Sequence, residues 1–260
     1  MQSHYHSGED ILDKLVHLID NIIMSKIAKP NGLTLSKSRI SLTARKLWNF
    51  LALKSRNQLD YNKMYSCTLS EVYSYMTWTS RNTPYVKREL QSLVNSSIEF
   101  VEFGAKTRQP WLVCALLASV SFNGDLIEWE YPRKLVAKMM KKEKYALIDM
   151  TLNSQFTNVG KMALYEYLMS YKNFASTPLI SVEDWVNICI ADKKTFAMWK
   201  YLNIDYFKPL FEKLKIEVGL KCSLEYKKTG REIVAVKVKF SQMTAKERLQ
   251  FYTGTSKALL

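Results

Sequence analysis

The sequence predicts an α+β protein that is mostly helical, with small antiparallel sheets, in two tandem domains. Apolar residues recur at spacings of three and four through much of the chain, which is typical of amphipathic helices. Two hairpin signals, Asn123-Gly124 and the turn at 227–231, each follow a series of such helices. The elements before the two hairpins come in a similar order, so the two halves are predicted to share one architecture.

The length and composition allow one large or two ordinary domains with a substantial core. The chain has 260 residues, of which 47% are hydrophobic. Its apolar runs are all shorter than a membrane span, and the most apolar early stretch, residues 11–27, contains four charged residues, Asp13, Lys14, Asp20 and Lys26. We therefore expect a soluble protein of the cytoplasm.

The charge of the chain indicates a polyanionic partner. The formal net charge is +14. Residues 26–90 hold twelve Lys and Arg against three acidic residues, and residues 193–240 hold twelve against five. Residues 91–131, which lie between them, hold two basic residues against five acidic ones. This distribution predicts two basic surfaces on two modules.

The first half opens with a predicted amphipathic helix over 10–28, which ends at Pro30-Asn31-Gly32. Two heptads are too few for a coiled coil, so we expect this helix to pack on the body of the protein. A second helix is predicted over 41–53, with Arg45 and Lys46 on its outward face. A strand over 65–69 and a helix over 71–76, capped by Ser70, complete this part of the chain.

The next helix has a strong start signal at Thr83-Pro84, an N-cap followed by proline in the first turn. Its apolar positions, Val86, Leu90, Leu93 and Val94, are predicted to be buried. Strands over 98–103 and 111–122 follow, and Asn123-Gly124 turns the chain into a return strand over 126–131. This order is that of a winged helix, in which the second helix of a helix-turn-helix enters the major groove and the hairpin, or wing, lies on the DNA backbone.

A similar order is predicted after a connector helix over 132–145. A long amphipathic helix is expected over 159–173. Further helices are expected over 182–190, with a capping-box-like start at Ser181 and Asp184, and over about 201–217. A hairpin over 220–240 then closes the second half. The predicted domains are an N-terminal helix and linker (1–32), a first winged helix with its connector (33–145), a second winged helix (146–240), and a tail with a short helix (241–260).

The second hairpin alternates apolar residues with residues that include Lys237 and Lys239, and its turn carries Lys227, Lys228 and Arg231. Two interpretations remain open. The lysines keep an edge strand soluble, or the hairpin lies against the phosphate backbone of a nucleic acid.

Motifs for catalysis or metal binding are weak. The four cysteines are scattered, and all three histidines precede residue 18. His4-Tyr5-His6 has the pattern of a rolling-circle nuclease metal site, but it lies at the extreme terminus without strand alternation around it. A phosphate-binding GxxxxGK[ST] loop is also missing. We therefore expect no enzymatic activity, no catalytic residue, no bound metal and no cofactor.

Three stretches resemble the iteron-binding replication initiators of theta-replicating plasmids. VGKMALYEYLMSYKN (159–173) is similar to the helix that opens the family's second winged helix. YFKPLFEKL (206–214) is similar to its recognition helix, and EYKKTGREIVAVKVKF (225–240) to its closing wing. A weaker likeness covers residues 68–90. The chain departs from the family at Asn203-Ile204-Asp205, where paired basic residues are common, so base reading by such a pair does not carry over.

The resemblance implies binding to direct repeats (iterons) in duplex DNA at a plasmid origin, melting of the adjacent duplex, initiation of replication and copy-number control. It also implies recruitment of the host helicase and host initiator, and a monomer in equilibrium with a homodimer that represses its own gene. The dimer is expected to form through the first-domain strands, where a charge at Leu116 or Leu117, whichever is exposed, would favour monomers.

The alternatives are a winged-helix transcriptional regulator without a replication role and a module whose basic faces bind acidic protein. For a DNA-binding chain, the expected contact residues are Arg81, Asn82, Tyr85, Lys87 and Arg88 in the first domain, Lys200, Asn203 and Lys208 in the second recognition helix, and Lys227, Lys228 and Arg231 in the second wing.

Overall fold

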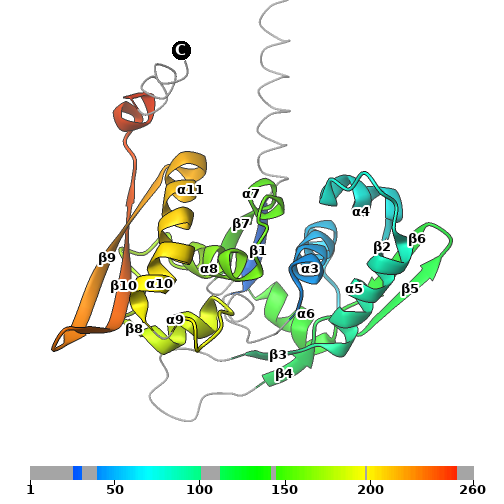
Figure 1. The fold of residues 1–260 in the computed structure, drawn as a ribbon. Coiled ribbons are helices and arrows are strands. Elements are labelled where there is room, and N and C mark those ends of the chain that lie inside the picture. The colour runs from blue at the N-terminus through cyan, green and yellow to red at the C-terminus, as the bar shows by residue number, and fades with distance from the viewer. Residues whose placement is uncertain (1–25, 31–39, 101–111, 142–144, 197, 251–260) are drawn as a thin grey trace, which may run out of the picture.

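The structure is a computed structural model that describes residues 26–30, 40–100, 112–141, 145–196 and 198–250. Two winged-helix units lie on either side of a central two-stranded sheet (Figure 1). This sheet pairs β1 (Lys26–Pro30) with β7 (Tyr145–Asp149) in antiparallel register. The predicted α+β class, with small antiparallel sheets and tandem winged helices, is therefore confirmed.

The first unit follows the predicted order of helix, strand, helix, helix and hairpin. Its helices are α3 (Leu42–Ser55), α4 (Leu69–Met76) and α5 (Thr83–Asn95). Its strands are β2 (Tyr65–Thr68), β3 (Ser97–Phe100), β4 (Leu112–Ala115), β5 (Ser119–Asn123) and β6 (Leu126–Glu130). Strands β2, β6 and β5 form one antiparallel sheet, and β3 pairs with β4 in a separate ladder.

Side-chain caps fix where the helices of the helix-turn-helix begin. Thr68, not Ser70, caps α4 and forms a reciprocal capping box with Glu71. Asn82, not Thr83, caps α5 by accepting a hydrogen bond from the Tyr85 backbone N–H at 3.0 Å. The predicted starts were therefore wrong by one or two residues, because several neighbouring polar residues can act as caps.

The predicted strand over 111–122 is interrupted. Leu116 and Leu117 lie between β4 and β5 and are buried in the core. The chain changes sheets here, since the Leu116 N–H donates to the Ser96 carbonyl and the Ala118 N–H to the Glu130 carbonyl. Neither leucine is exposed, so a charge at either position would disrupt the core and would not report on a dimer.

The second unit begins beyond α6 (Arg133–Met140), which is shorter than the predicted connector helix. Its helical segments are α7 (Met150–Ser154), α8 (Val159–Met169), α9 (Val182–Ile188), α10 (Trp199–Leu202), the π-helical turn η1 (Asn203–Phe207) and α11 (Lys208–Val218). Its strands are β8 (Ile180–Ser181), β9 (Leu220–Thr229) and β10 (Glu232–Gln242), in the spatial order β8-β10-β9. Ser181 caps α9 as predicted.

The hairpin β9–β10 rests on α9 through its apolar face. Val236 and Val238 are fully buried, and the indole N–H of Trp185 donates to the Val236 carbonyl at 3.1 Å. The pairing register shifts at Val234, which explains why this valine is only half-buried despite the alternation. Residues 245–250 form the expected short helix, which Arg248 joins to the end of α11 by donating to the Val218 carbonyl.

The predicted helix over 10–28 is contradicted at its end. Residues 10–25 lie outside the described residues, but Lys26–Pro30 form strand β1. Ile27 and Lys29 of this strand are buried, whereas Ala28 is exposed, which is the alternation of a strand. The partner strand β7 was not predicted, because the pairing joins segments that lie far apart in the sequence.

A buried charge cluster centred on Glu166 of α8 joins the two units. Glu166 is completely buried and accepts from the Arg45 guanidinium at 2.5 Å, from Lys29 Nζ at 2.8 Å and from Asn49 Nδ2 at 2.8 Å. Arg45 was predicted to face outward, which was wrong: it is 2% exposed because Glu166 lies against that side of α3. The amphipathic character predicted for 159–173 was also wrong, since α8 is buried almost all round.

Electrostatics within the cluster favour the ionised carboxylate. Burial raises the pKa of Glu166, but attraction to Arg45 and Lys29 lowers it by more. The net result is a pKa of about 2, well below the usual value. Burial lowers the pKa of Lys29 to about 8, although attraction to Glu166 opposes this change. One carboxylate is thus shared by two buried cations, and the cluster keeps a net positive charge.

We predict that Glu166→Gln destabilises the protein by about 3–5 kcal/mol, because it leaves two buried cations without a counter-charge. Since the pKa of the folded carboxylate lies below its unfolded value, its contribution is present above pH 4.5 and is lost as the pH falls towards 2. The difference between wild type and variant, measured by denaturant unfolding, should therefore shrink across this range. Glu183→Gln, which removes an exposed pair with Lys193, is the control and should cost little. Equal losses for the two variants would contradict the central role of Glu166.

A close helix contact at Gly160 shapes the second unit. A methyl group at Gly160 would lie 1.9 Å from the Cys189 carbonyl oxygen and 2.7 Å from the Tyr206 ring. Glycine therefore lets the first turn of α8 touch both the end of α9 and the π-helical turn η1.

The described helices include none with the length and apolar content to cross a bilayer.

We predict that Gly160→Ala lowers the stability of the second unit by about 1–3 kcal/mol, the usual cost of overpacking. Helix propensity alone predicts the opposite, a gain of about 1 kcal/mol. Thermal unfolding followed by circular dichroism decides between them. Gly124→Ala is the control, because that glycine (φ +59°) has no atom within 4 Å of an added Cβ and only backbone strain would result. An increase in melting temperature for Gly160→Ala would rule out the close contact.

Candidate DNA-binding surface

The exposed side of α5 carries most of the first-unit residues predicted to bind DNA. Arg81, Asn82, Lys87 and Arg88 are all exposed. The Arg88 guanidinium stacks on the Tyr85 ring at 4.8 Å, and Lys87 Nζ lies 4.9 Å from the Phe122 ring of β5. The helix and its wing are therefore connected through the side chains that would face a duplex.

Tyr85 is held by contacts within the protein. Its ring is half-buried and packs against Trp78 at 5.5 Å, and its hydroxyl donates to Thr43 Oγ1 of α3 at 2.8 Å. A hydroxyl held in this way fixes the ring under Arg88 and does not reach outward. The side-chain oxygen of Asn82 is likewise occupied by the α5 cap. Arg81, Lys87 and Arg88 are then the exposed charged groups, and the Arg88 guanidinium also lies 3.6 Å from the Glu89 carboxylate.

The hairpin β5–β6, which is the first wing, is acidic. Asp125, Glu128 and Glu130 are the charged residues of the hairpin, and residues 119–131 contain neither Lys nor Arg. Ser119 donates to Glu130 at 2.9 Å, and Ser121 donates to Glu128 at 3.4 Å, so the carboxylates are held on the strands. This wing has no basic side chain of its own for a phosphate contact.

The second helix-turn-helix consists of α9 and the continuous segment α10–η1–α11. Lys200 and Lys208 are exposed on this segment. Asn203, also predicted to read bases, is only half-exposed, and its side-chain oxygen is buried without a hydrogen-bond partner among the described residues. Trp199, Phe207, Leu210 and Leu214 anchor the opposite side of the helix in the core.

The second wing carries positive charge at its tip. Lys227, Lys228 and Arg231 are exposed around Gly230, whose φ of +60° completes the turn. The ion pairs found in the described part of the chain do not include these three residues. Lys237 and Lys239, in contrast, pair with Glu225 at 3.4 and 2.5 Å. The lysines paired with Glu225 lie on β10, the central strand of this sheet, and are distinct from the exposed charges at the tip.

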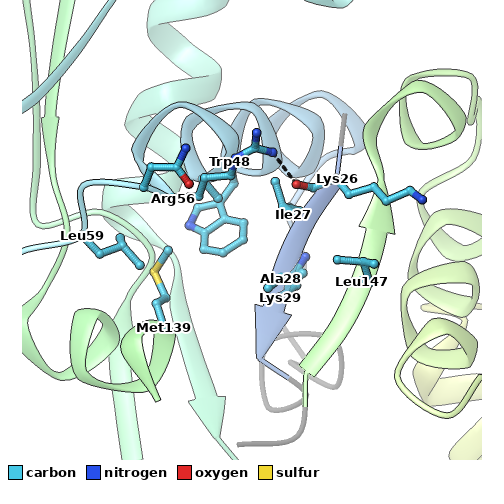
Figure 2. A pocket seen from close by; sticks show the side chains of 11 residues that line it. Lys26, Ile27, Ala28, Lys29, Trp48, Arg56, Leu59, Met139 and Leu147 are labelled. Atoms are coloured by element: carbon cyan, nitrogen blue, oxygen red, sulfur yellow. Dashed lines mark hydrogen bonds between the residues drawn. The ribbon is translucent and has the colours of Figure 1, made fainter. Parts of the chain in front are cut away.

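A cavity of about 500 Å³ lies between β1, α3 and α6 (Figure 2). Trp48, Leu59 and Met139 contribute apolar surface to it, and Arg56 closes one end by donating to the Lys26 carbonyl. No sequence pattern indicated this cavity, because its walls come from distant segments.

Within the described ranges, His, Cys, Asp and Glu do not gather in a group of three that could hold a metal. His4 and His6 lie outside the described residues.

Comparison with known proteins identifies one family and similar solved structures. Residues 26–169, more than half of the chain, match the family model described as "Initiator Replication protein, WH1". No match was found among curated proteins. The chain is similar to a crystal structure of domains 2 and 3 of RctB, with 10% identity over 77% of this chain and 80% of that chain and a TM-score of 0.43.

The family match begins at the first residue of β1 and ends at the last residue of α8. It therefore covers the first winged helix, the acidic wing, the central sheet and the helix that carries Glu166. The resemblance noted from sequence motifs is confirmed by this match. The chain belongs to the family of replication initiator proteins.

Proposed function

We propose that this initiator binds direct repeats in duplex DNA at a plasmid origin and starts replication there. The observation that supports this most is the pair of helix-turn-helix units with exposed basic residues. α5 presents Lys87 and Arg88, and the second unit presents Lys200 and Lys208 beside a basic wing tip. Each unit would contact one part of a repeat, with its recognition helix in the major groove.

The two units would contribute to binding unequally. The second wing supplies three exposed charges, which bind phosphates without reading sequence. The first wing is acidic, so the first unit would depend on α5, where the Tyr85 ring and the guanidinium of Arg88 form a stacked pair. A guanidinium fixed in direction is well suited to bidentate contact with guanine.

The remaining parts of the proposal rest on family membership. The chain would act in the cytoplasm, where plasmid DNA lies, without catalysis of its own. It would recruit the host helicase and host initiator, and a homodimer in equilibrium with the monomer would repress its gene. The β3–β4 ladder, where Val113 is exposed, is the surface we propose for the dimer.

We predict that the full chain selects tandem repeats from the DNA surrounding its own gene over bulk DNA. Arg88→Ala should lower the affinity for the selected repeat by about 1–3 kcal/mol and the affinity for random DNA much less. Electrophoretic mobility shift at fixed salt measures both affinities. Lys134→Ala, which removes an exposed charge from α6, is the control and should leave the selectivity unchanged.

The same binding assay separates the rival functions. A single palindrome as the preferred site would favour a transcriptional regulator with no replication role. Failure to bind DNA even at low salt would favour a module for acidic proteins and would overturn the proposal.

We predict that replacing Lys227, Lys228 and Arg231 together by alanine weakens binding to repeats and to random DNA by the same factor. The plot of log affinity against log salt should flatten by about one unit per charge removed, because fewer counterions are released. Lys239→Ala on the same hairpin is the matched control, since Glu225 already compensates this lysine. An unaltered salt slope in the triple variant would mean that the hairpin is only a protected edge.

A further inference from the structure

The second recognition helix, α10–η1–α11, does not present the side-chain oxygen of Asn203 on its outward face. Leu202, Tyr206, Leu210 and Leu214 mark the buried side of the helix. Residues at the opposite positions, Ile204 and Lys208, therefore point away from the core. The oxygen of Asn203 is buried without a partner among the described residues, so this amide cannot offer its full pattern of donor and acceptor to a base.

Large apolar side chains occupy the first part of this outward face. Met198 is 55% exposed, Tyr201 44% and Ile204 46%. Tyr201 of α10 and Ile204 of η1 are three residues apart and lie on one side of the helical segment, and Met198 immediately precedes it. Exposed apolar residues that lie together, as these do, often mark an interaction site. The π-helical turn at Asn203–Phe207 coincides with them, and such turns occur often at functional sites.

The charges around these residues favour a DNA groove, not another protein, as the partner of this face. Lys200 and Lys208 flank Ile204, and the exposed charges of the second wing belong to the same unit. The wing also contacts the helix directly, since Tyr226 of β9 packs against Trp199 at 6.1 Å. Asp205 and Glu212 are exposed on the same helix, so a position along the phosphates is disfavoured. Insertion into the major groove would instead bring the outward face of the helix to the base edges.

We propose that Ile204, supported by Tyr201, determines sequence specificity by contacting the 5-methyl groups of thymine in the major groove. The methyl group is the one apolar feature that the major groove displays, and it distinguishes a T·A pair from the others. An isoleucine at the centre of the outward face matches this chemistry. The inference rests on the proposed binding of repeats and deepens it by naming the feature that the second unit reads.

The test compares two synthetic duplexes of the repeat that wild-type protein selects. In one of them every thymine is replaced by uracil, which lacks only the methyl group. Wild type should bind the uracil duplex more weakly, by about fourfold for each methyl group that Ile204 would have touched. Ile204→Ala should bind the thymine duplex with a similar reduction in affinity and should no longer distinguish the two duplexes. The substitution is at the surface and places a good helix former, so the fold is retained.

Ile216→Ala is the matched control, because Ile216 is 41% exposed on the same helical segment but lies near its far end. It should distinguish the two duplexes as wild type does. If wild type selects a repeat but binds both duplexes equally, the thymine contact is wrong and the proposed function stands. If Ile204→Ala still discriminates like wild type, the contact belongs to another residue and this proposal fails. If wild type selects no repeat, the proposed function fails and the inference with it.

Discussion

The contact between Glu166 and its two cations is the interaction on which the arrangement of the molecule depends. Lys29 comes from β1, Arg45 from α3 and Glu166 from α8, so three segments distant in sequence meet at one carboxylate. Burying these charges is unfavourable, and their mutual attraction with the hydrogen bond from Asn49 offsets that cost only in this geometry. A buried ionic contact is more selective in direction than apolar packing, which makes it suited to fixing how the two winged-helix units stand relative to each other.

Helix α8 connects the Glu166 charge cluster to the second recognition helix. Its middle carries Glu166, and its first turn touches α9 and η1 at Gly160. Because the interior is closely packed, a change at either contact would be transmitted along a rigid helix of eleven residues. The position of Ile204 and Lys208 is thus tied through α8 to the central sheet, and the family match includes α8 but ends before α9 and η1.

Sequence patterns predicted the elements whose signals are local. The hairpin at Asn123-Gly124, the cap at Ser181 and the alternation around Val236 and Val238 were confirmed because each depends on a few adjacent residues. Features that depend on distant partners were missed. Strand β1 needs β7 to be a strand, and Arg45 is buried only because Glu166 meets it 121 residues later. In the candidate site, charge identified the basic residues, but the inward turn of the Asn203 oxygen required the three-dimensional packing around η1.

The unlike charges of the two hairpins have a consequence for how the molecule would sit on DNA. In the proposed complex, the second hairpin would follow the duplex backbone beside its groove, whereas the first, with Asp125 at its turn, would be held away from it. The two units would then cover unequal lengths of DNA and leave an asymmetric footprint. An asymmetric footprint gives a bound chain a polarity along the duplex. Direct repeats all run in one sense, so successive copies would point the same way and mark one side of the array as different from the other.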